Sequence, residues 1–397
     1  MFSNIYNRFR RITTNQLYFP EIDGIRFLAI VLVVLFHTHG YFIDKSTINF
    51  IDNPGKSIDP ARYYWLNTLL FNGDRGVELF FVLSGFILCL PFAHHYINHG
   101  KKVQLKKYYL RRVTRLEPPY FIAMTAIFLM HILINTHPVS VLLPHWFASL
   151  AYSHNVIYHH APLLTVVAWS LEIEIQFYLL APLLFSLLAL NKITRRTILF
   201  TASVVLMLLQ TLYIPPFNSI YGYAQYFFTG ILLADFYVSN TAASFFNKKW
   251  MVFPALACLI AIVYWPIKNQ PWGTISFAHL SFPYLLGLFY YIILKNDQVK
   301  RVFSYKFIPV IGGMCYSIYL LHYTIISFLG RFTIGFHLTG YYLPNLLLQI
   351  ILLGIPVLLL SSVFYFYIER PFMSKKWMDK LMKKDKKEEE TNMQAKV

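Results

Sequence analysis

Apolar residues recur along this chain in stretches that are longer than ordinary core helices require. A helix that crosses the hydrocarbon core of a bilayer needs about 20 mostly apolar residues. We predict about ten such helices, at residues 27–43, 77–97, 117–135, 168–190, 197–214, 220–239, 251–267, 277–294, 308–334 and 343–368. The pattern therefore predicts an all-α fold, a polytopic membrane helix bundle.

Basic residues are distributed unequally between the segments that connect these stretches. When the segments are assigned alternately to two sides, one side holds most of the lysines and arginines: 1–26, 98–116, 191–196, 240–250, 295–306 and 369–397. On the other side, segment 44–76 balances four basic residues with four acidic ones, and segment 136–167 has neither Lys nor Arg. Cytoplasmic loops carry an excess of Lys and Arg. We therefore predict that the first set of segments, and with it both termini, is cytoplasmic.

The two ends of the chain differ in character from the region between them. Residues 1–19 read as a basic cytoplasmic segment, and the apolar run from Phe27 reads as a first span because no small-residue cleavage site follows it. Residues 374–397 mix Lys and Glu without an apolar face, which is typical of a solvated cytoplasmic tail. Residues 20–373 are predicted to form one membrane domain.

Composition supports a membrane location and argues against two kinds of partner. The chain is 57% hydrophobic and 13% charged, whereas soluble domains are about a quarter charged. A net charge of +17 raises nucleic acid as a partner, but the basic residues cluster between apolar stretches, so topology explains them and no nucleic acid is expected. The three cysteines and the six histidines of residues 131–160 match no metal-binding spacing, so no metal is expected either.

Ionisable residues inside membrane helices are costly and are functional candidates by default. Arg26 and His37 are 11 residues apart, so they share a helix face about 16 Å apart along the axis. Glu78 enters the next stretch from the opposite side at about the depth of His37, where a carboxylate could orient the imidazole and raise its basicity. The alternatives are an arginine at the membrane border, a histidine bonded to a backbone carbonyl, and an acid favoured by a helix N-terminus.

Further polar residues recur at helical spacing. Arg112 and Arg115 are at i and i+3, so both can face one anionic ligand, although positive charge on cytoplasmic loops is an alternative explanation. Glu174 shares a helix face with Tyr178. The remaining candidates are Asp23, Trp169, Ser317, Tyr319, His322, Glu369 and Arg370.

Six of these segments, in this order, resemble the acyltransferase-3 family of membrane O-acyltransferases. The match consists of Asp23-Gly24-Ile25-Arg26 followed by His37, the run 76–86 (GVELFFVLSGF), the run 112–115 (RVTR), the run 169–178 (WSLEIEIQFY), the run 316–322 (YSIYLLH) and the run 369–372 (ERPF). The resemblance covers roughly residues 20–373. The chain departs from the family pattern at Glu78, where Asp is common, at Ile175, where a second acid is common, and at Tyr323-Thr324, where Trp-Pro is frequent.

The resemblance implies an enzyme of a multi-pass cell inner membrane that moves an acyl group, usually acetyl, from cytoplasmic acyl-CoA to a hydroxyl group, commonly on a surface polysaccharide. Acetyl-CoA would be the donor substrate, with no cofactor bound permanently. The resemblance implies a catalytic role for His37, with Arg26, and donor handling by Arg112 and Arg115. Some family members carry an extra extracytoplasmic hydrolase-like domain, and we expect none in this chain.

Our mechanistic hypothesis is that the two arginines hold the nucleotide end of the donor while the thioester reaches His37. His37, oriented by Glu78, then either deprotonates the acceptor hydroxyl or carries the acyl group briefly. The main alternative is a transporter or flippase of a lipid-linked sugar or small metabolite, which would also have many spans and buried charges. Such proteins usually show an internal repeat or paired broken helices, and the sequence shows neither.

Overall fold

The computed structural model describes residues 18–46, 50, 60–213, 215–266 and 277–373, and these form helices joined by turns and loops, with no β-strand among them. The predicted N-terminal segment and C-terminal tail lie almost entirely outside the described residues. Each predicted span coincides with a helix. These helices are α2 (Pro20–Lys45), α4 (Arg75–Ile97), α5 (Leu105–Leu133), α8 (Ala168–Phe185), α9 (Lys192–Leu212), α10 (Ile220–Val238), α12 (Val252–Tyr264), α13 (Phe277–Lys295), α16 (Cys315–Thr333) and α17 (Tyr342–Phe364).

Short elements connect the long helices. They are α3 (Pro60–Phe71), α6 (Val139–Leu150), α7 (His154–Tyr158), η1 (Ser186–Ala189), α11 (Ala243–Phe246), η2 (Lys249–Met251), α14 (Asp297–Phe303), α15 (Ile308–Gly313), the π-helical η3 (Tyr365–Glu369) and α18 (Arg370–Phe372). Within the described part of the chain, seven helical regions are long and apolar enough to cross a membrane. They begin with α2, α4, α5, α8, α9, α13 and α17, and the all-α polytopic bundle is thereby confirmed.

Three of the ten predicted spans, α10, α12 and α16, do not meet the same criteria of length and hydropathy. The helix α12 has only 13 residues and is extended at its start by η2. The other two carry buried polar residues, such as Asp235 in α10 and His322 in α16. Their low hydropathy is therefore a property of helices enclosed by other helices, which need not present apolar side chains to lipid on every face.

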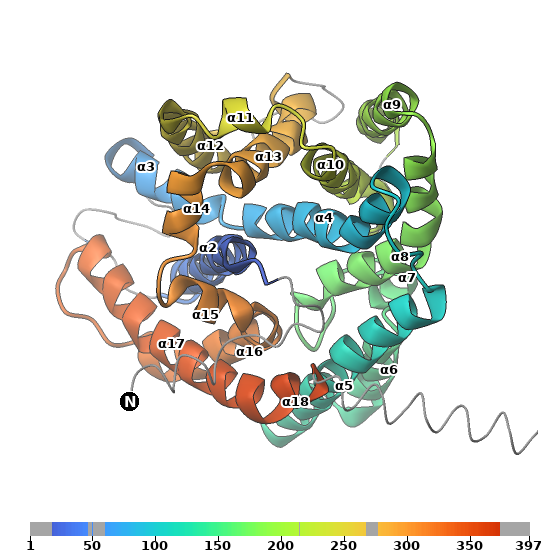
Figure 1. Cartoon of the computed structure of the whole chain (residues 1–397). Helices are drawn as coiled ribbons and strands as arrows, with labels where there is room; N and C mark the ends of the chain where they lie inside the picture. The colour runs from blue at the N-terminus through green and yellow to red at the C-terminus, as the bar shows by residue number, and fades with distance from the viewer. Residues whose placement is uncertain (1–17, 47–49, 51–59, 214, 267–276, 374–397) are drawn as a thin grey trace, which may run out of the picture.

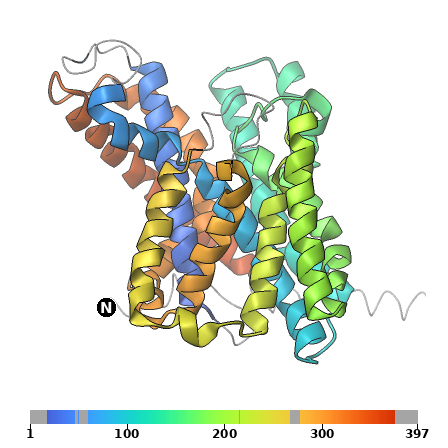
Figure 2. The ribbon, with the colours of Figure 1, turned by 90° about the horizontal axis from the view of Figure 1, so that it is seen from above.

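The connecting segments divide between the two ends of the bundle. Figure 2 shows α3 and α6 at one end and α11 at the opposite end. This is the division that the charge pattern predicts, because α3 and α6 fall in the segments with few net positive charges and α11 falls in a basic segment.

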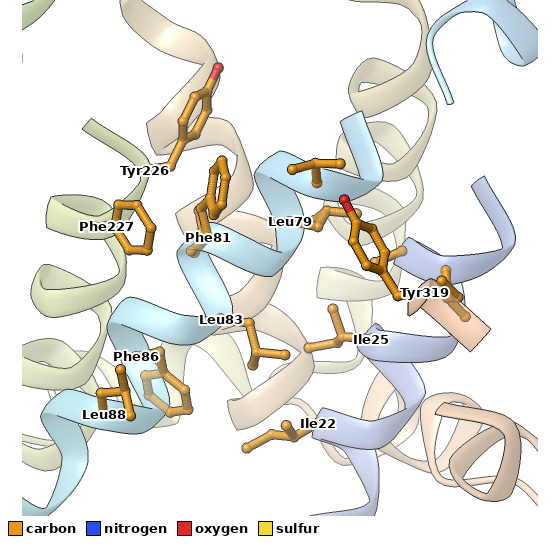
Figure 3. Packing of buried hydrophobic residues seen from close by; sticks show 14 of the residues in the cluster. Ile22, Ile25, Leu79, Phe81, Leu83, Phe86, Leu88, Tyr226, Phe227 and Tyr319 are labelled. Atoms are coloured by element: carbon orange, nitrogen blue, oxygen red, sulfur yellow. The ribbon is translucent and has the colours of Figure 1, made fainter. Parts of the chain in front are cut away.

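The helix α4 occupies the middle of the bundle. Figure 1 shows α2, α15 and α16 on one side of it and α10 and α13 on the other. The close-up in Figure 3 shows Phe81 of α4 beside Phe227 of α10, while Leu83 faces Ile25 of α2. All three elements belong to one apolar cluster of buried side chains, so the core itself holds α2 against α4.

Small residues let two of these helices approach closely. A Cβ atom on Gly85 of α4 would lie 2.4 Å from the backbone oxygen of Phe227, and one on Gly230 of α10 would lie 2.3 Å from the backbone oxygen of Val82. Any side chain here would push the helices apart. Small residues at helix interfaces allow close packing of this kind.

A buried ion cluster joins α9 to α10. The carboxylate of Asp235 is fully buried and accepts hydrogen bonds from Arg195 Nε at 2.7 Å and from Arg196 Nε. The second guanidinium nitrogen of Arg195 lies 2.5 Å from the same carboxylate. Because a buried charge must be paired, this cluster fixes the register of the two helices.

Candidate functional site

His37 lies inside the bundle and is enclosed by aromatic rings. It is half-buried on α2, and the centroid of its ring lies 5.0 Å from Phe36, 5.1 Å from Tyr323 and 5.2 Å from His322. Both Tyr323 and His322 belong to α16, far along the chain. The structure therefore brings together two of the predicted site residues, His37 and His322.

His322 is held by its own helix. It is fully buried, and its Nδ1 lies 3.0 Å from the carbonyl oxygen of Ile318 and 2.8 Å from that of Tyr319. Carbonyl oxygens only accept hydrogen bonds, so Nδ1 carries the proton and is the donor. The other nitrogen, Nε2, is buried and has no hydrogen-bond partner among the residues that the structure describes.

Glu78 is engaged with α10. Its carboxylate accepts a hydrogen bond of 2.9 Å from the hydroxyl of Tyr226, and Arg75 and Tyr223 are further electrostatic neighbours of this group. A titratable group that acts electrostatically on His37 is His322. The structure thus shows His322 as a ring neighbour of His37 and Tyr226 as a hydrogen-bond partner of Glu78. Depth along a helix was all that the sequence offered, and depth does not say which neighbour a side chain faces.

Arg26 and Asp23 form an ion pair one turn apart near the start of α2. The Arg26 side chain is only 11% exposed, and Asp23 is buried. Close packing reinforces this turn, because a Cβ atom on Gly312 of α15 would lie 1.7 Å from the backbone oxygen of Asp23. Arg26 is thereby held at the predicted axial distance from His37, three turns earlier on the same helix.

A second polar cluster forms where α4, α5 and α8 meet. The carboxylate of Glu174 accepts hydrogen bonds from the hydroxyls of Ser84 and Tyr178. Arg112 and Arg115 lie close enough to act electrostatically on this carboxylate. The predicted shared faces, Glu174 with Tyr178 and Arg112 with Arg115, are therefore both present, and the two faces meet.

Arg112 is held by an aromatic ring. Its guanidinium carbon lies 4.3 Å from the centroid of the Tyr108 ring, which is one turn earlier on α5. Its Nη1 donates a hydrogen bond of 3.3 Å to the carbonyl oxygen of Tyr108. A guanidinium stacked in this way keeps its planar fork presented in a fixed direction, as recognition of a phosphate or carboxylate requires.

Three of the predicted residues, Ser317, Tyr319 and Glu369, brace α16, the helix that carries His322. The hydroxyl of Tyr319 lies 2.5 Å from Ser170 Oγ and donates to the carbonyl oxygen of Val167 at 3.1 Å, which ties α16 to the start of α8. The backbone N–H and hydroxyl of Ser317 both donate to Glu369 of the π-helical segment η3. The start of α8 and the segment η3 thus fix α16 from two directions.

Two predicted residues contribute packing. Trp169 lies against Tyr223 with ring centroids 5.3 Å apart, and against Phe81 with centroids 6.4 Å apart. The guanidinium carbon of Arg370 lies 5.7 Å from the centroid of the Phe366 ring.

Three histidines of residues 131–160, namely His145, His154 and His160, form a cluster that the sequence did not predict. His145 Nδ1 lies 2.8 Å from His154 Nε2, and the His160 ring lies 5.9 Å from the first and 5.3 Å from the second. Burial, and then the neighbouring His145, lower the pKa of His154 to about 4. In the described part of the chain, no group of three or more His, Cys, Asp or Glu residues has an arrangement suited to a metal ion.

A small pocket of about 130 Å³ lies beside this cluster. His159, His160 and Asn155 line it on one side, and the turn 215–218 lines it on the other. The carboxylate of Glu172 accepts hydrogen bonds from the backbone and side-chain nitrogens of Asn155 at 2.9 and 3.2 Å, so this wall of the pocket is anchored to α8.

Comparison with known proteins identifies the family of this chain. A model of the acyltransferase-3 family, described as an acyltransferase domain, matches residues 19–366. The chain is similar to the peptidoglycan O-acetyltransferase OatA of Listeria monocytogenes, with 27% identity over 341 residues that cover 78% of this chain and 50% of that protein. It is also similar to the O-acetyltransferase OatA of Staphylococcus aureus strain NCTC 8325, with 26% identity over 391 residues that cover 90% and 58% of the two chains.

A third relative is a putative O-acetyltransferase of Staphylococcus aureus strain COL, with 23% identity over 384 residues, or 89% of this chain and 57% of that protein. The chain therefore spans between half and about three fifths of the length of these relatives. No solved structure matches the chain.

Proposed function

Because this chain belongs to the acyltransferase-3 family, we propose that it is a membrane O-acyltransferase. It transfers an acyl group, acetyl in the first instance, from cytoplasmic acyl-CoA to a hydroxyl group on the other face of the cell inner membrane. Two relatives are named O-acetyltransferase, one of them for peptidoglycan, and this supports a surface polysaccharide as the acceptor.

The observation that carries this proposal is a half-buried histidine inside the bundle with arginines disposed toward one end. Arg26 lies near the start of α2, and Arg112 and Arg115 lie in the first half of α5. One long helix, α4, separates α2 from α5 along the chain, so both begin at the same end of the bundle. An anionic donor could therefore enter at this end and extend toward His37 along α2.

Coenzyme A suits this arrangement. Its phosphate groups match the arginine forks of Arg112 and Arg115, which bind such groups bidentately. Its pantetheine arm is long and thin, and the axial separation of about 16 Å between Arg26 and His37 is of the length that such an arm spans. The charge pattern of the loops, which favours a cytoplasmic location for this end, supports a donor from the cytoplasm.

His37 supplies the chemistry in one of two ways. As a general base, it takes the proton of the acceptor hydroxyl while the hydroxyl oxygen attacks the thioester carbonyl carbon. The carbon–sulfur bond then breaks, and the sulfur leaves as a thiolate that takes up a proton. As a nucleophile, the unprotonated nitrogen of His37 first forms a bond to the carbonyl carbon, and the carbon–sulfur bond breaks as the thiolate leaves. The acceptor hydroxyl oxygen then attacks the same carbon and the carbon–nitrogen bond breaks. The proton that the hydroxyl loses balances the one that the thiolate takes up.

The test is mass spectrometry of surface polysaccharide from cells that make the wild-type protein, His37→Gln, or no protein. Acetyl-CoA consumption by membranes is measured in parallel, and His279→Gln, another histidine of a long apolar helix, is the matched control. Loss of an acetyl-sized increment in His37→Gln and in the deletion, but not in the control, supports the proposal.

An unchanged polysaccharide with consumption that still depends on His37 would move the acceptor to a smaller molecule. If neither the polysaccharide nor the consumption depends on His37, the proposal fails and a transporter becomes the better explanation.

A further inference from the structure

We propose that His322 is a positioning residue for His37. In this proposal, Nε2 of His322 accepts a hydrogen bond from one ring nitrogen of His37, directly or through one water, and thereby leaves the other nitrogen of His37 unprotonated and free to react. The inference rests on the proposed function and deepens it, because it assigns a partner to the reactive group.

The backbone of α16 fixes the tautomer of His322. A neutral imidazole has one nitrogen that donates and one that accepts. Nδ1 of His322 lies within hydrogen-bond distance of two backbone carbonyl oxygens, those of Ile318 and Tyr319, and neither can donate. Nδ1 is therefore the donor, and Nε2 of the neutral ring carries a lone pair.

The lone pair of Nε2 is available on the side of the ring opposite to the backbone of α16. The Nδ1 edge of the ring faces its own helix, so the Nε2 edge faces away from it. The His37 ring is a neighbour of the His322 ring, with centroids 5.2 Å apart and planes tilted by 49°. Nε2 is buried and has no hydrogen-bond partner among the residues that the structure describes. A buried acceptor is costly when unmatched, and an N–H group of His37 matches it.

A positioning residue must itself be held, and α16 is tied to α8 through Tyr319 and Ser170, and to η3 through Ser317 and Glu369. The hydrogen bonds from Nδ1 to the carbonyl oxygens of Ile318 and Tyr319 then fix the ring of His322 on this helix. In a catalytic triad, a carboxylate orients the histidine by accepting a hydrogen bond from its N–H group. His322 would orient His37 in the same way, with a neutral acceptor in place of the charged one.

The consequence is the same for both chemical routes. A general base needs an unprotonated nitrogen aimed at the acceptor hydroxyl, and a nucleophile needs an unprotonated nitrogen aimed at the thioester carbon. When Nε2 of His322 accepts a hydrogen bond from the protonated nitrogen of His37, the reactive lone pair lies on the other ring nitrogen of His37. Without His322, His37 populates both tautomers and a wider range of ring orientations.

The test uses amides that replace one nitrogen of His322 at a time. The amide of Asn reaches the position of Nδ1, so His322→Asn keeps a donor for the backbone carbonyls but offers nothing to His37. The amide of Gln reaches the position of Nε2, so His322→Gln offers an acceptor to His37. We expect His322→Asn to lower kcat by about 100-fold, with KM for acetyl-CoA nearly unchanged, because positioning acts on the proton-transfer step. We expect His322→Gln to recover a large part of that loss.

Several outcomes overturn the inference. Wild-type kcat in a folded His322→Asn protein refutes it, as does a fall in kcat that is equal in the Asn and Gln variants. If the Asn variant does not fold, the comparison moves to Gln and Leu, which both lose the backbone anchor. Higher kcat in Gln than in Leu supports the inference, and equal kcat refutes it.

Failure of the inference is separable from failure of the proposed function. Loss of transfer in His37→Gln together with full transfer in His322→Asn refutes the positioning role alone. Full transfer in His37→Gln refutes the mechanism and the positioning role together.

Discussion

The buried ion cluster of α9 and α10 gives a sharp prediction about stability. Asp235 is fully buried, and the side chains of Arg195 and Arg196 that it pairs with are 8% and 18% exposed. Replacing Asp235 by Ala leaves two largely buried cations with weaker partners: the Leu190 carbonyl for Arg195, and the Thr241 hydroxyl and the Phe236 ring for Arg196. Removing one partner of a buried ion pair costs about 3–5 kcal/mol.

The assay is thermal unfolding of the detergent-solubilised protein. We expect a fall in Tm of several degrees or more for Asp235→Ala, and a smaller fall for Asp235→Asn, which keeps one acceptor oxygen. The matched control is Asp44→Asn, because Asp44 pairs with Lys45 at 2.7 Å but both side chains are more than half exposed. Exposed pairs contribute little, so Tm should stay nearly constant in this control.

The reasoning also requires that activity per folded molecule remain unchanged, because Asp235 touches none of the candidate site residues described above. A Tm within one degree of wild type in Asp235→Ala would refute the view that this cluster holds α9 against α10. Wild-type stability with lost transfer would instead place Asp235 in the machinery of transfer.

Two further predictions concern the donor and the histidine cluster. Arg112→Gln or Arg115→Gln should raise KM for acetyl-CoA by about 10-fold or more, since a hydrogen bond to a charged group contributes about 1.5–3 kcal/mol, while Lys107→Gln should leave KM unchanged; steady-state kinetics on membranes checks this. Because the pKa of His154 falls from 6.5 to about 4 on folding, the unfolded chain binds more protons below pH 6.5. The stability contributed by the neutral ring is therefore complete above pH 6.5 and is lost as the pH falls toward 4, and a plot of Tm against pH should flatten in His154→Gln.

The sequence predicted those features that depend on local spacing. The apolar stretches predicted the helices, and the charge pattern predicted which connecting segments lie at the same end. Neighbours at i+3 and i+4 were also predictable, such as Asp23 with Arg26 and Glu174 with Tyr178. In each case the relevant distance is set by the geometry of a single helix.

Contacts between helices were not predictable in the same way. Glu78 and His322 were both candidates, and only the packing of α4 and α16 decides that His322 lies beside His37 while Glu78 faces Tyr226. The rotation of each helix about its axis is fixed by close approaches such as that of Gly85 to Phe227. A single sequence contains no direct record of such approaches, because the two residues are far apart along the chain.

The polar residues of α16 are best understood together. A polar group without a hydrogen-bond partner costs free energy in a membrane interior. A polar residue is therefore found there when it has a partner or a function. Ser317 and Tyr319 have partners, in Glu369 and Ser170, and these bonds hold the helix. His322 follows them on the same helix, with one nitrogen bonded to the backbone and the other on the edge of the ring that faces away from the helix. Along α16, Ser317 and Tyr319 therefore hold the helix in place, and the helix in turn places His322 against His37.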